Sequence, residues 1–307
     1  MPVFPAVFIR VPATSANLGP GFDALGVAFR LHNEIQLQES ERDSFSATGE
    51  GAEELSHRRD TIAHRAAHRV FAALRLEVAG FHLQLHNRIP FARGLGSSSA
   101  AIVGGLVAAN ECARRATGRA LSPEKLLDLA TEIEGHPDNV APALLGGLVV
   151  AATRENGSVA AVSVPVARFP KFAVWIPDAQ LETKVARGVL PSHYSRADAI
   201  FNLSRSALLV GALAAGDFSS LSEALRDKIH QDFRAPLVPG FDAISRAALS
   251  AGALGVTLSG AGPSILAWMP GETAPIIAAI ENAARESNVA GRVEELEVDL
   301  SGCQIVN

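Results

Sequence analysis

The alternation of hydrophobic and polar positions predicts strands and helices along the chain. Residues 3–11 are rich in β-branched and aromatic side chains and predict a first strand, which is followed by a structured loop at 12–23. Apolar residues at helical spacing predict a helix at 61–74 after the N-cap candidate Asp60. Residues 81–85 alternate as a strand does, so a helix precedes a strand in this part of the chain.

Two further helices are predicted in the same half of the sequence. The small, apolar run 98–116 predicts a buried helix that begins directly after a glycine-rich loop. A second helix is predicted at 123–134, because Ser122 can cap its first turn and Gly135 can end it. The segment 136–142 is predicted to be another loop, which the chain brings near the first.

The rest of the chain predicts helices and strands that alternate. Strands are predicted at 147–152, 160–164, 172–176, 253–258, 264–268 and 292–298. Helices are predicted at 197–215, 218–229, 240–251 and 273–287. Because the chain exceeds the usual size of a single hydrophobic core, we expect two lobes, residues 1–165 and residues 166–307, with the ligand site between them.

Composition and charge exclude several classes of protein. The 307 residues are 48% hydrophobic and 19% charged, and we find no apolar run approaching the roughly 20 residues that span a bilayer. No export signal is evident, so a soluble, cytoplasmic protein is expected. A net charge of −5 argues against a nucleic-acid partner, which would require clustered Lys and Arg. Cys112 and Cys303 lie in no metal-binding pattern and are expected to be packing residues.

The glycine- and serine-rich segment 93–100 has the chemistry of an anion-binding loop. It joins a loop to the N-terminus of a predicted helix, where unpaired N–H groups and the helix dipole favour an anion. It is not a P-loop, because no Gly-Lys-Ser/Thr follows, and Ser99 stands where a dinucleotide fingerprint needs its third glycine. Glycines let the backbone approach a polyphosphate, so we expect Gly96→Val to block ATP binding while folding largely survives.

Three motifs in order resemble the GHMP kinases, a superfamily that includes galactokinase, mevalonate kinase and phosphomevalonate kinase. Pro90–Ser98 resembles the central Pro-x-x-x-Gly-Leu-Gly-Ser-Ser motif, which covers the triphosphate. Val11–Asp23 resembles the N-terminal motif, and Ser259–Ser264 resembles the C-terminal motif. Within the superfamily, parts of 15–26 and the segment 134–142 resemble the branch that phosphorylates the amino acid L-homoserine in threonine biosynthesis.

The resemblance implies both a fold and a reaction. The implied fold is α+β and two-lobed, with an N-terminal lobe like ribosomal protein S5 domain 2 and a ferredoxin-like C-terminal lobe. The implied reaction transfers the γ-phosphoryl group of ATP to the side-chain hydroxyl of L-homoserine, with ATP and Mg²⁺ as cofactors. The rival functions are a GHMP kinase for another small alcohol and an inactive GHMP protein that only binds ligand. The oligomeric state, with a homodimer as one alternative, and regulation by threonine stay open.

The resemblance also assigns roles to individual residues. The ATP-binding set is Pro90, Arg93, Gly94, Leu95, Gly96, Ser97, Ser98 and Ser99. The substrate-binding set is Asn17, Asp23, His136, Thr183, Arg187 and Arg234. The catalytic set is Asn139, Glu134 and Ser98, and of these Ser98 and Glu134 would bind Mg²⁺. The substrate set is chemically coherent, because an aspartate pairs with an ammonium group and guanidinium forks bind a carboxylate.

Two assignments keep alternatives. Glu132 is the alternative to Glu134 as the metal ligand. Asn139 stands where mevalonate and galactose kinases carry an aspartate thought to act as a base, and an amide cannot accept a proton at useful pH. Catalysis would then depend on alignment and charge neutralisation, which a loose phosphoryl-transfer transition state permits. Asp138 is the alternative base, although the resemblance implies a structural role for it.

Overall fold

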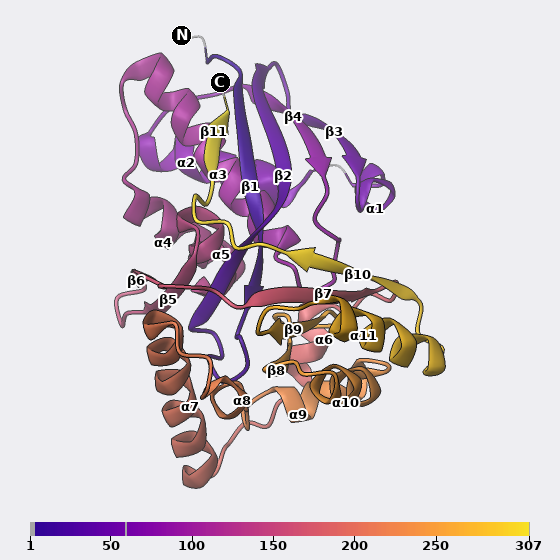
Figure 1. Ribbon diagram of the computed structural model, residues 1–307. Coiled ribbons are helices and arrows are strands. Elements are labelled where there is room, and N and C mark those ends of the chain that lie inside the picture. The colour runs from indigo at the N-terminus through magenta and orange to yellow at the C-terminus, as the bar shows by residue number, and fades with distance from the viewer. Residues whose placement is uncertain (1–3, 59, 307) are drawn as a thin grey trace.

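The computed structural model describes residues 4–58 and 60–306 and shows two β-sheets with helices packed on them (Figure 1). The first sheet has seven strands and the second has four. The connection after residue 164 leads from the first sheet to the second, and the last strand returns to the first. The expected α+β class is therefore confirmed.

The first sheet is built around one long strand. Its members are β1 (Val7–Ala16), β2 (Leu25–Ser40), β3 (Ser44–Gly49), β4 (Gly80–Asn87), β5 (Leu148–Thr153), β6 (Val159–Val164) and β11 (Gln304–Val306). The order is β11-β1-β2-β4-β3, with β5 pairing with β2 and β6. β2 can pair with both β4 and β5 because they lie along different parts of its length, β4 at 34–40 and β5 at 25–27. Among the strand pairs that the described residues form in this sheet, β3–β4 is parallel and the others are antiparallel.

Helices of the first half cover one face of this sheet. They are α1 (Ala52–Ser56), α2 (Ile62–Leu74), α3 (Ser97–Thr117), α4 (Pro123–Glu134) and α5 (Pro137–Leu145). The long helix α3 contacts β1, β2 and α2, and its small residues allow close packing. A Cβ atom added at Gly105 would lie 2.3 Å from the Ala63 oxygen in α2. Cys112, also in α3, is buried, as expected for a packing residue.

The second sheet has the order β10-β7-β9-β8, with antiparallel neighbours. Its strands are β7 (Lys171–Pro177), β8 (Gly255–Leu258), β9 (Ile265–Met269) and β10 (Gly291–Leu296). The helices of this half are α6 (Thr183–Gly188), α7 (Arg196–Ala215), α8 (Leu221–Ala224), α9 (Gln231–Arg234), η1 (Ala235–Leu237), α10 (Phe241–Ser250) and α11 (Ala274–Glu286). The two longest helices after α7, α10 and α11, pack on each other and share a hydrophobic core with this sheet.

Most predicted elements are present, and four predictions need correction. The first strand lies at Val7–Ala16, so it includes part of the predicted loop, and Thr61 caps α2 in place of Asp60 by accepting a hydrogen bond from His64 N. The predicted loop 136–142 is helix α5. The predicted helix 218–229 is reduced to the four residues of α8. Strands β2, β3 and β11 and helices α1, α6, α9 and η1 were not predicted.

Helix α7 is long and apolar. Among the described residues it is the one helix that is long and apolar enough to cross a membrane, with a mean hydropathy of 1.2 over its best window, of which 22% is buried. A single helix of this kind is weak evidence for a membrane span, because helices of globular proteins meet the same criterion. Its buried residues Leu209 and Leu213 belong to the main hydrophobic core.

Candidate active site

The three segments that carry the family motifs contact one another directly. The side chain of Asn17, in the loop after β1, donates a hydrogen bond to the Gly260 oxygen at 2.8 Å. Ser259 donates from Oγ to the Gly94 oxygen at 2.7 Å, which joins the turn after β8 to the loop before α3. Residues separated by more than 160 positions in the chain therefore form one compact site.

The glycines before α3 are required by close packing of these loops. Gly94 and Gly96 have φ values of +76° and +73°, which disfavour any side chain. A Cβ atom at Gly96 would lie 2.0 Å from Thr14 Oγ1, and one at Gly94 would lie 2.2 Å from the Ser259 oxygen. The space beside Gly96 is thus filled by protein. The expectation that Gly96→Val leaves folding largely intact is therefore wrong.

The N-terminus of α3 presents hydroxyl groups to a carboxylate. Ser98 donates from Oγ to Glu134 Oε2 at 3.1 Å, and the buried Ser99 donates to Oε1 of the same carboxylate at 2.7 Å. Glu134 is placed there because it is the last residue of α4. Glu132 instead pairs with Arg69 at 2.5 Å. The structure therefore brings Ser98 and Glu134 together and directs Glu132 elsewhere.

Other members of the predicted ATP-binding set have structural contacts. Pro90 and Leu95 are buried, and the Leu95 oxygen accepts a hydrogen bond from the backbone nitrogen of Thr14 at 3.1 Å. Arg93 donates hydrogen bonds to the backbone oxygens of Phe91, Pro177 and Asp178 at 2.9, 2.8 and 2.8 Å. Its guanidinium group therefore fastens the phosphate loop to the end of β7.

A carboxylate and two guanidinium groups lie beside the loop after β1. Asp23 forms a two-pronged ion pair with Arg187, with oxygen–nitrogen distances of 2.6 and 3.1 Å. Both side chains are about a third exposed, at 35% and 37%. The Phe22 ring lies 5.5 Å from the Arg187 guanidinium carbon and 5.3 Å from that of Arg234. Both cations thus lie near one aromatic ring at the site.

Arg234 is almost completely buried, with 1% of its surface exposed. Its Nε donates to the Ala186 oxygen at 3.1 Å, and its Nη1 donates to the Gly260 oxygen at 3.3 Å. Burial and the charge of Arg187 lower the pKa of Arg234. An arginine in an ordinary surface segment would have none of these contacts, so its burial supports the assignment to the site.

Helix α5 brings three polar side chains to the same place. His136 Nδ1 lies 2.5 Å from Asp138 Oδ1, and Asn139 accepts a hydrogen bond from Thr14 Oγ1 at 2.8 Å. Burial opposes protonation of His136, but the hydrogen bond and charge of Asp138 outweigh it and raise the pKa of His136. Asp23, His136 and Asp138 each present a ligand atom, and these atoms lie within 4.8 Å of one another.

Thr183 is the least defined member of the substrate-binding set. It is exposed at the first position of α6, four residues before Arg187 on the same short helix. Positions four apart lie on one helix face, so a ligand held by Arg187 could also meet Thr183.

The sequence did not identify several residues that shape this site. Asp227 and His230 are buried next to Arg234, and Asn202 from α7 donates to the Asp227 carboxylate at 2.7 Å. The four-residue spacing of His230 and Arg234 is visible in the sequence, but no motif distinguishes it from chance. A cavity of about 350 Å³ lies elsewhere, on the first sheet between Arg10, Gln84 and neighbouring side chains, and contains none of the predicted site residues.

Comparison with known proteins identifies the family. Residues 61–147 match the model of the GHMP kinase N-terminal domain, and residues 209–287 match that of the C-terminal domain. The chain therefore belongs to the GHMP kinases and is an ATP-dependent small-molecule kinase.

Individual relatives place the chain more narrowly. It is 44% identical to the homoserine kinase of Moorella thermoacetica over 94% of this chain and 96% of that protein. It is 42% identical to the homoserine kinase of Desulfitobacterium hafniense over 98% and 100% of the two chains. The crystal structure of homoserine kinase from Cytophaga hutchinsonii superposes with a TM-score of 0.85 and 30% identity, covering 98% and 97% of the two chains. Within the GHMP kinases, the chain belongs to the homoserine kinase family.

Proposed function

We propose that the protein transfers the γ-phosphoryl group of ATP to the side-chain hydroxyl of L-homoserine, producing O-phospho-L-homoserine and ADP. The observation that carries the substrate assignment is the grouping of Asp23, Arg187 and Arg234 beside the phosphate loop. A carboxylate next to two guanidinium groups is complementary to both charged ends of an α-amino acid. Mevalonate and neutral sugars carry no ammonium group for Asp23.

The ion pair between Asp23 and Arg187 supports a binding mode in which the substrate replaces this ion pair with its own two charged groups. In the free protein each charge neutralises the other, at 2.6 Å. An amino acid that enters between them places its ammonium group on Asp23 and its carboxylate on Arg187 and Arg234. One ion pair is thereby replaced by pairs at both ends of the ligand. Because the two side chains are partly exposed, the pair can open without unfolding its surroundings.

Serine hydroxyls and a carboxylate at the start of α3 fit a magnesium ion. Mg²⁺ prefers hard oxygen ligands and usually keeps waters and substrate phosphates in its coordination shell. Ser98 and Glu134 offer such oxygens next to the helix N-terminus that would bind the triphosphate. When bound there, the ion would neutralise negative charge on the phosphate oxygens.

The acceptor hydroxyl is proposed to react by alignment, without a strong base. The bond from the hydroxyl oxygen to the γ-phosphorus forms while the bond to the β–γ bridging oxygen breaks, which leaves the electron pair on ADP. The hydroxyl proton passes late to an oxygen of the transferred phosphoryl group and from there to water. The Asn139 amide cannot take that proton, and Asp138 already pairs with His136. Asn139→Ala should therefore slow turnover without changing the pKa values of the pH–rate profile. Loss of an acidic limb in Asp138→Asn would instead identify Asp138 as the base.

A substrate panel tests the proposed function. ADP release is measured with homoserine, mevalonate and galactose as acceptors, and the phosphorylated product is identified by mass spectrometry. We expect turnover with homoserine to exceed that with the other two acceptors by at least about 100-fold. Preference for mevalonate or galactose would contradict the substrate assignment. Nucleotide binding without turnover of any acceptor would indicate a protein that only binds ligand.

A further inference from the structure

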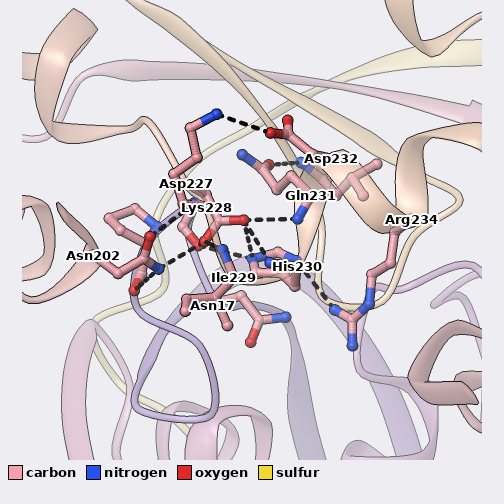
Figure 2. A network of polar contacts seen from close by, with 12 residues as sticks. Asn17, Asn202, Asp227, Lys228, Ile229, His230, Gln231, Asp232 and Arg234 are labelled. Carbon is pink, nitrogen blue, oxygen red and sulfur yellow. Dashed lines mark hydrogen bonds and ion pairs between the residues drawn. The ribbon is translucent and has the colours of Figure 1, made fainter. Parts of the chain in front are cut away.

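Buried polar groups connect Arg234 to the loop after β1 (Figure 2). His230 is 0% exposed and lies between the two. Its Nε2 atom lies 2.8 Å from the backbone oxygen of Gly19, and its Nδ1 atom lies 3.2 Å from Nη1 of Arg234. The same imidazole therefore contacts both the proposed carboxylate-binding cation and the loop that carries Asp23.

The partners of His230 determine its protonation. A carbonyl oxygen only accepts hydrogen bonds, so Nε2 carries the proton that is donated to Gly19. A guanidinium group only donates, so Nδ1 must present its lone pair to Arg234. His230 is therefore neutral, with its proton on Nε2. Burial and the charge of Arg234 lower its pKa despite the charge of Asp227, which favours the neutral form.

Asp227 holds the backbone of residues 229–231 and does not compete with Gly19 for the hydrogen bond from the His230 imidazole. Its carboxylate accepts hydrogen bonds from the backbone nitrogens of Ile229, His230 and Gln231 at 3.1, 2.8 and 2.7 Å, and from the side chain of Asn202 at 2.7 Å. Asp227 Oδ2 lies 3.8 Å from His230 Nε2, which is too long for a hydrogen bond. The contact with Ile229 also explains why the end of the predicted helix 218–229 is irregular, since such bonds compete with helical ones.

Arg234 has one face fixed by protein and one edge left for a ligand. Nε and Nη1 donate to Ala186, Gly260 and His230. Within residues 4–58 and 60–306, Nη2 donates no hydrogen bond, although it carries two N–H groups. The three contacts define the plane of the guanidinium group and hence the direction of Nη2. His230 is the only side chain among these three partners, because the others contribute backbone oxygens.

We propose that His230 is a positioning residue for substrate specificity. It sets the direction of the free edge of Arg234, and it holds that edge in register with the loop that carries Asn17 and Asp23. The inference rests on the proposed function, in which Arg234 binds the carboxylate of the amino acid. If the carboxylate-binding edge of Arg234 and the loop that carries Asp23 keep a fixed separation, the α-carbon of the substrate is held at a fixed distance from the phosphate. This distance would determine the length of the alcohol that is phosphorylated.

Two substitutions separate the two contacts of His230. His230→Gln retains an N–H donor near Nε2 for Gly19 and loses the acceptor for Arg234. His230→Asn retains an acceptor near Nδ1 for Arg234 and loses the contact with Gly19. We expect His230→Gln to raise KM for homoserine about 10-fold, the effect of one hydrogen bond to a charged group, with KM for ATP unchanged. His230→Asn should retain most of the affinity for homoserine but lower kcat with it, because the contact that keeps Arg234 in register with the loop carrying Asp23 is lost. His193→Gln, at an exposed histidine, is the matched control and should behave as wild type.

The neutral analogue homoserinol, which lacks the carboxylate, gives the decisive comparison. The effect of His230→Gln should be much smaller with homoserinol than with homoserine. Equal losses on both acceptors, or an unchanged KM for homoserine, would overturn the positioning role. If wild type failed to phosphorylate homoserine, the proposed function itself would fail. If wild type were active and only Arg187→Ala affected homoserine, this inference alone would fail.

A measurement on the wild-type protein covers the case in which the variants do not fold. Nitrogen-15 NMR of the histidine side chains distinguishes the two neutral tautomers and the imidazolium. We expect two buried histidines, His64 and His230, to stay neutral with the proton on Nε2 down to about pH 6, below the usual pKa of histidine. One of these two signals, that of His230, should have an Nδ1 shift that changes on addition of homoserine and not of homoserinol. If only one histidine or none were neutral at that pH, or if homoserine left the Nδ1 shifts of both neutral histidines unchanged, the proposal would be wrong.

Discussion

Replacement of Arg187 by alanine is the cleanest perturbation of the proposed carboxylate site. The guanidinium group of Arg187 makes its hydrogen bonds to Asp23, and the side chain is 37% exposed, so its removal leaves no buried acceptor unpaired. Arg234→Ala would be harder to interpret, because Arg234 is 1% exposed and its loss would leave the buried oxygen of Ala186 and the buried Nδ1 of His230 without the donor that Arg234 supplies. Each buried group left unsatisfied costs about 1–3 kcal/mol of folding free energy.

The size of the effect follows from the exposure of the pair. Loss of one partner of a desolvated charge pair at a binding site costs about 2–5 kcal/mol, and each 1.4 kcal/mol is tenfold. Because Asp23 and Arg187 are about a third exposed, solvent screening favours the low end of that range. We therefore expect Arg187→Ala to lower kcat/KM for homoserine by about 30-fold while KM for ATP changes little. Arg187→Lys should also be impaired, because lysine lacks the planar fork.

The assay compares homoserine with homoserinol under identical conditions. Wild type should use homoserinol poorly, and Arg187→Ala should lose far less activity with homoserinol than with homoserine. Lys184→Ala removes an exposed cation from the same helix and serves as the matched control. If Arg187→Ala reduced activity equally on both acceptors, Arg187 would not bind the carboxylate, and the assignment of an amino-acid substrate would lose its main chemical support.

Three further predictions concern the phosphate loop, the metal ligands and His136. Glu134→Gln should lower kcat at least about 10-fold and raise the Mg²⁺ concentration required for half-maximal activity. Glu132→Gln should resemble wild type, and equal effects of the two substitutions would contradict the assignment of Glu134 to the metal site. Gly96→Val should lower Tm far more than Gly118→Val, because both positions have positive φ but a Cβ at Gly118 meets no atom within 4 Å; similar Tm values would contradict the packing argument. The raised pKa of His136 stabilises the fold fully below the ordinary value of 6.5, and this contribution is lost as the pH rises through the folded-state pKa. His136→Gln should therefore lower Tm more at about pH 6 than at about pH 9, and a pH-independent difference would refute this linkage.

Local patterns in the sequence were sufficient for elements whose hydrogen bonds lie within one segment. Helix α4 begins and ends at its predicted residues, because Ser122 caps its first turn and Gly135 adopts the left-handed conformation that ends it. The predictions failed for the helix 218–229, where a side chain bonds to nearby backbone groups, and for the loop 136–142, which forms a helix that contains a proline. The Asp227 carboxylate accepts a hydrogen bond from the backbone of Ile229, the last residue of the predicted helix 218–229, and α5 forms although it contains Pro142.

The family motifs determined the class of enzyme and the residue types of the site. Each motif is a continuous run of residues. The phosphate loop, the loop after β1 and the turn after β8 could therefore be identified without coordinates. The choice of Glu134 over Glu132 required the structure, because α4 directs one carboxylate to Ser98 and Ser99 and the other to Arg69. Two positions on a helix that differ by two residues face different directions, and only the neighbouring elements decide which direction is the site.

The contacts that orient the substrate-binding cations depend entirely on tertiary structure. Arg234 lies in a segment that resembles a surface turn, yet the fold buries it against Gly260, Ala186 and His230. The sequence determined that the chain carries the charges needed to bind a zwitterion. The tertiary structure decided which charges are paired, which edge of Arg234 stays free and which tautomer His230 adopts. These properties arise from hydrogen bonds between residues up to 211 positions apart, and no local pattern encodes such distances.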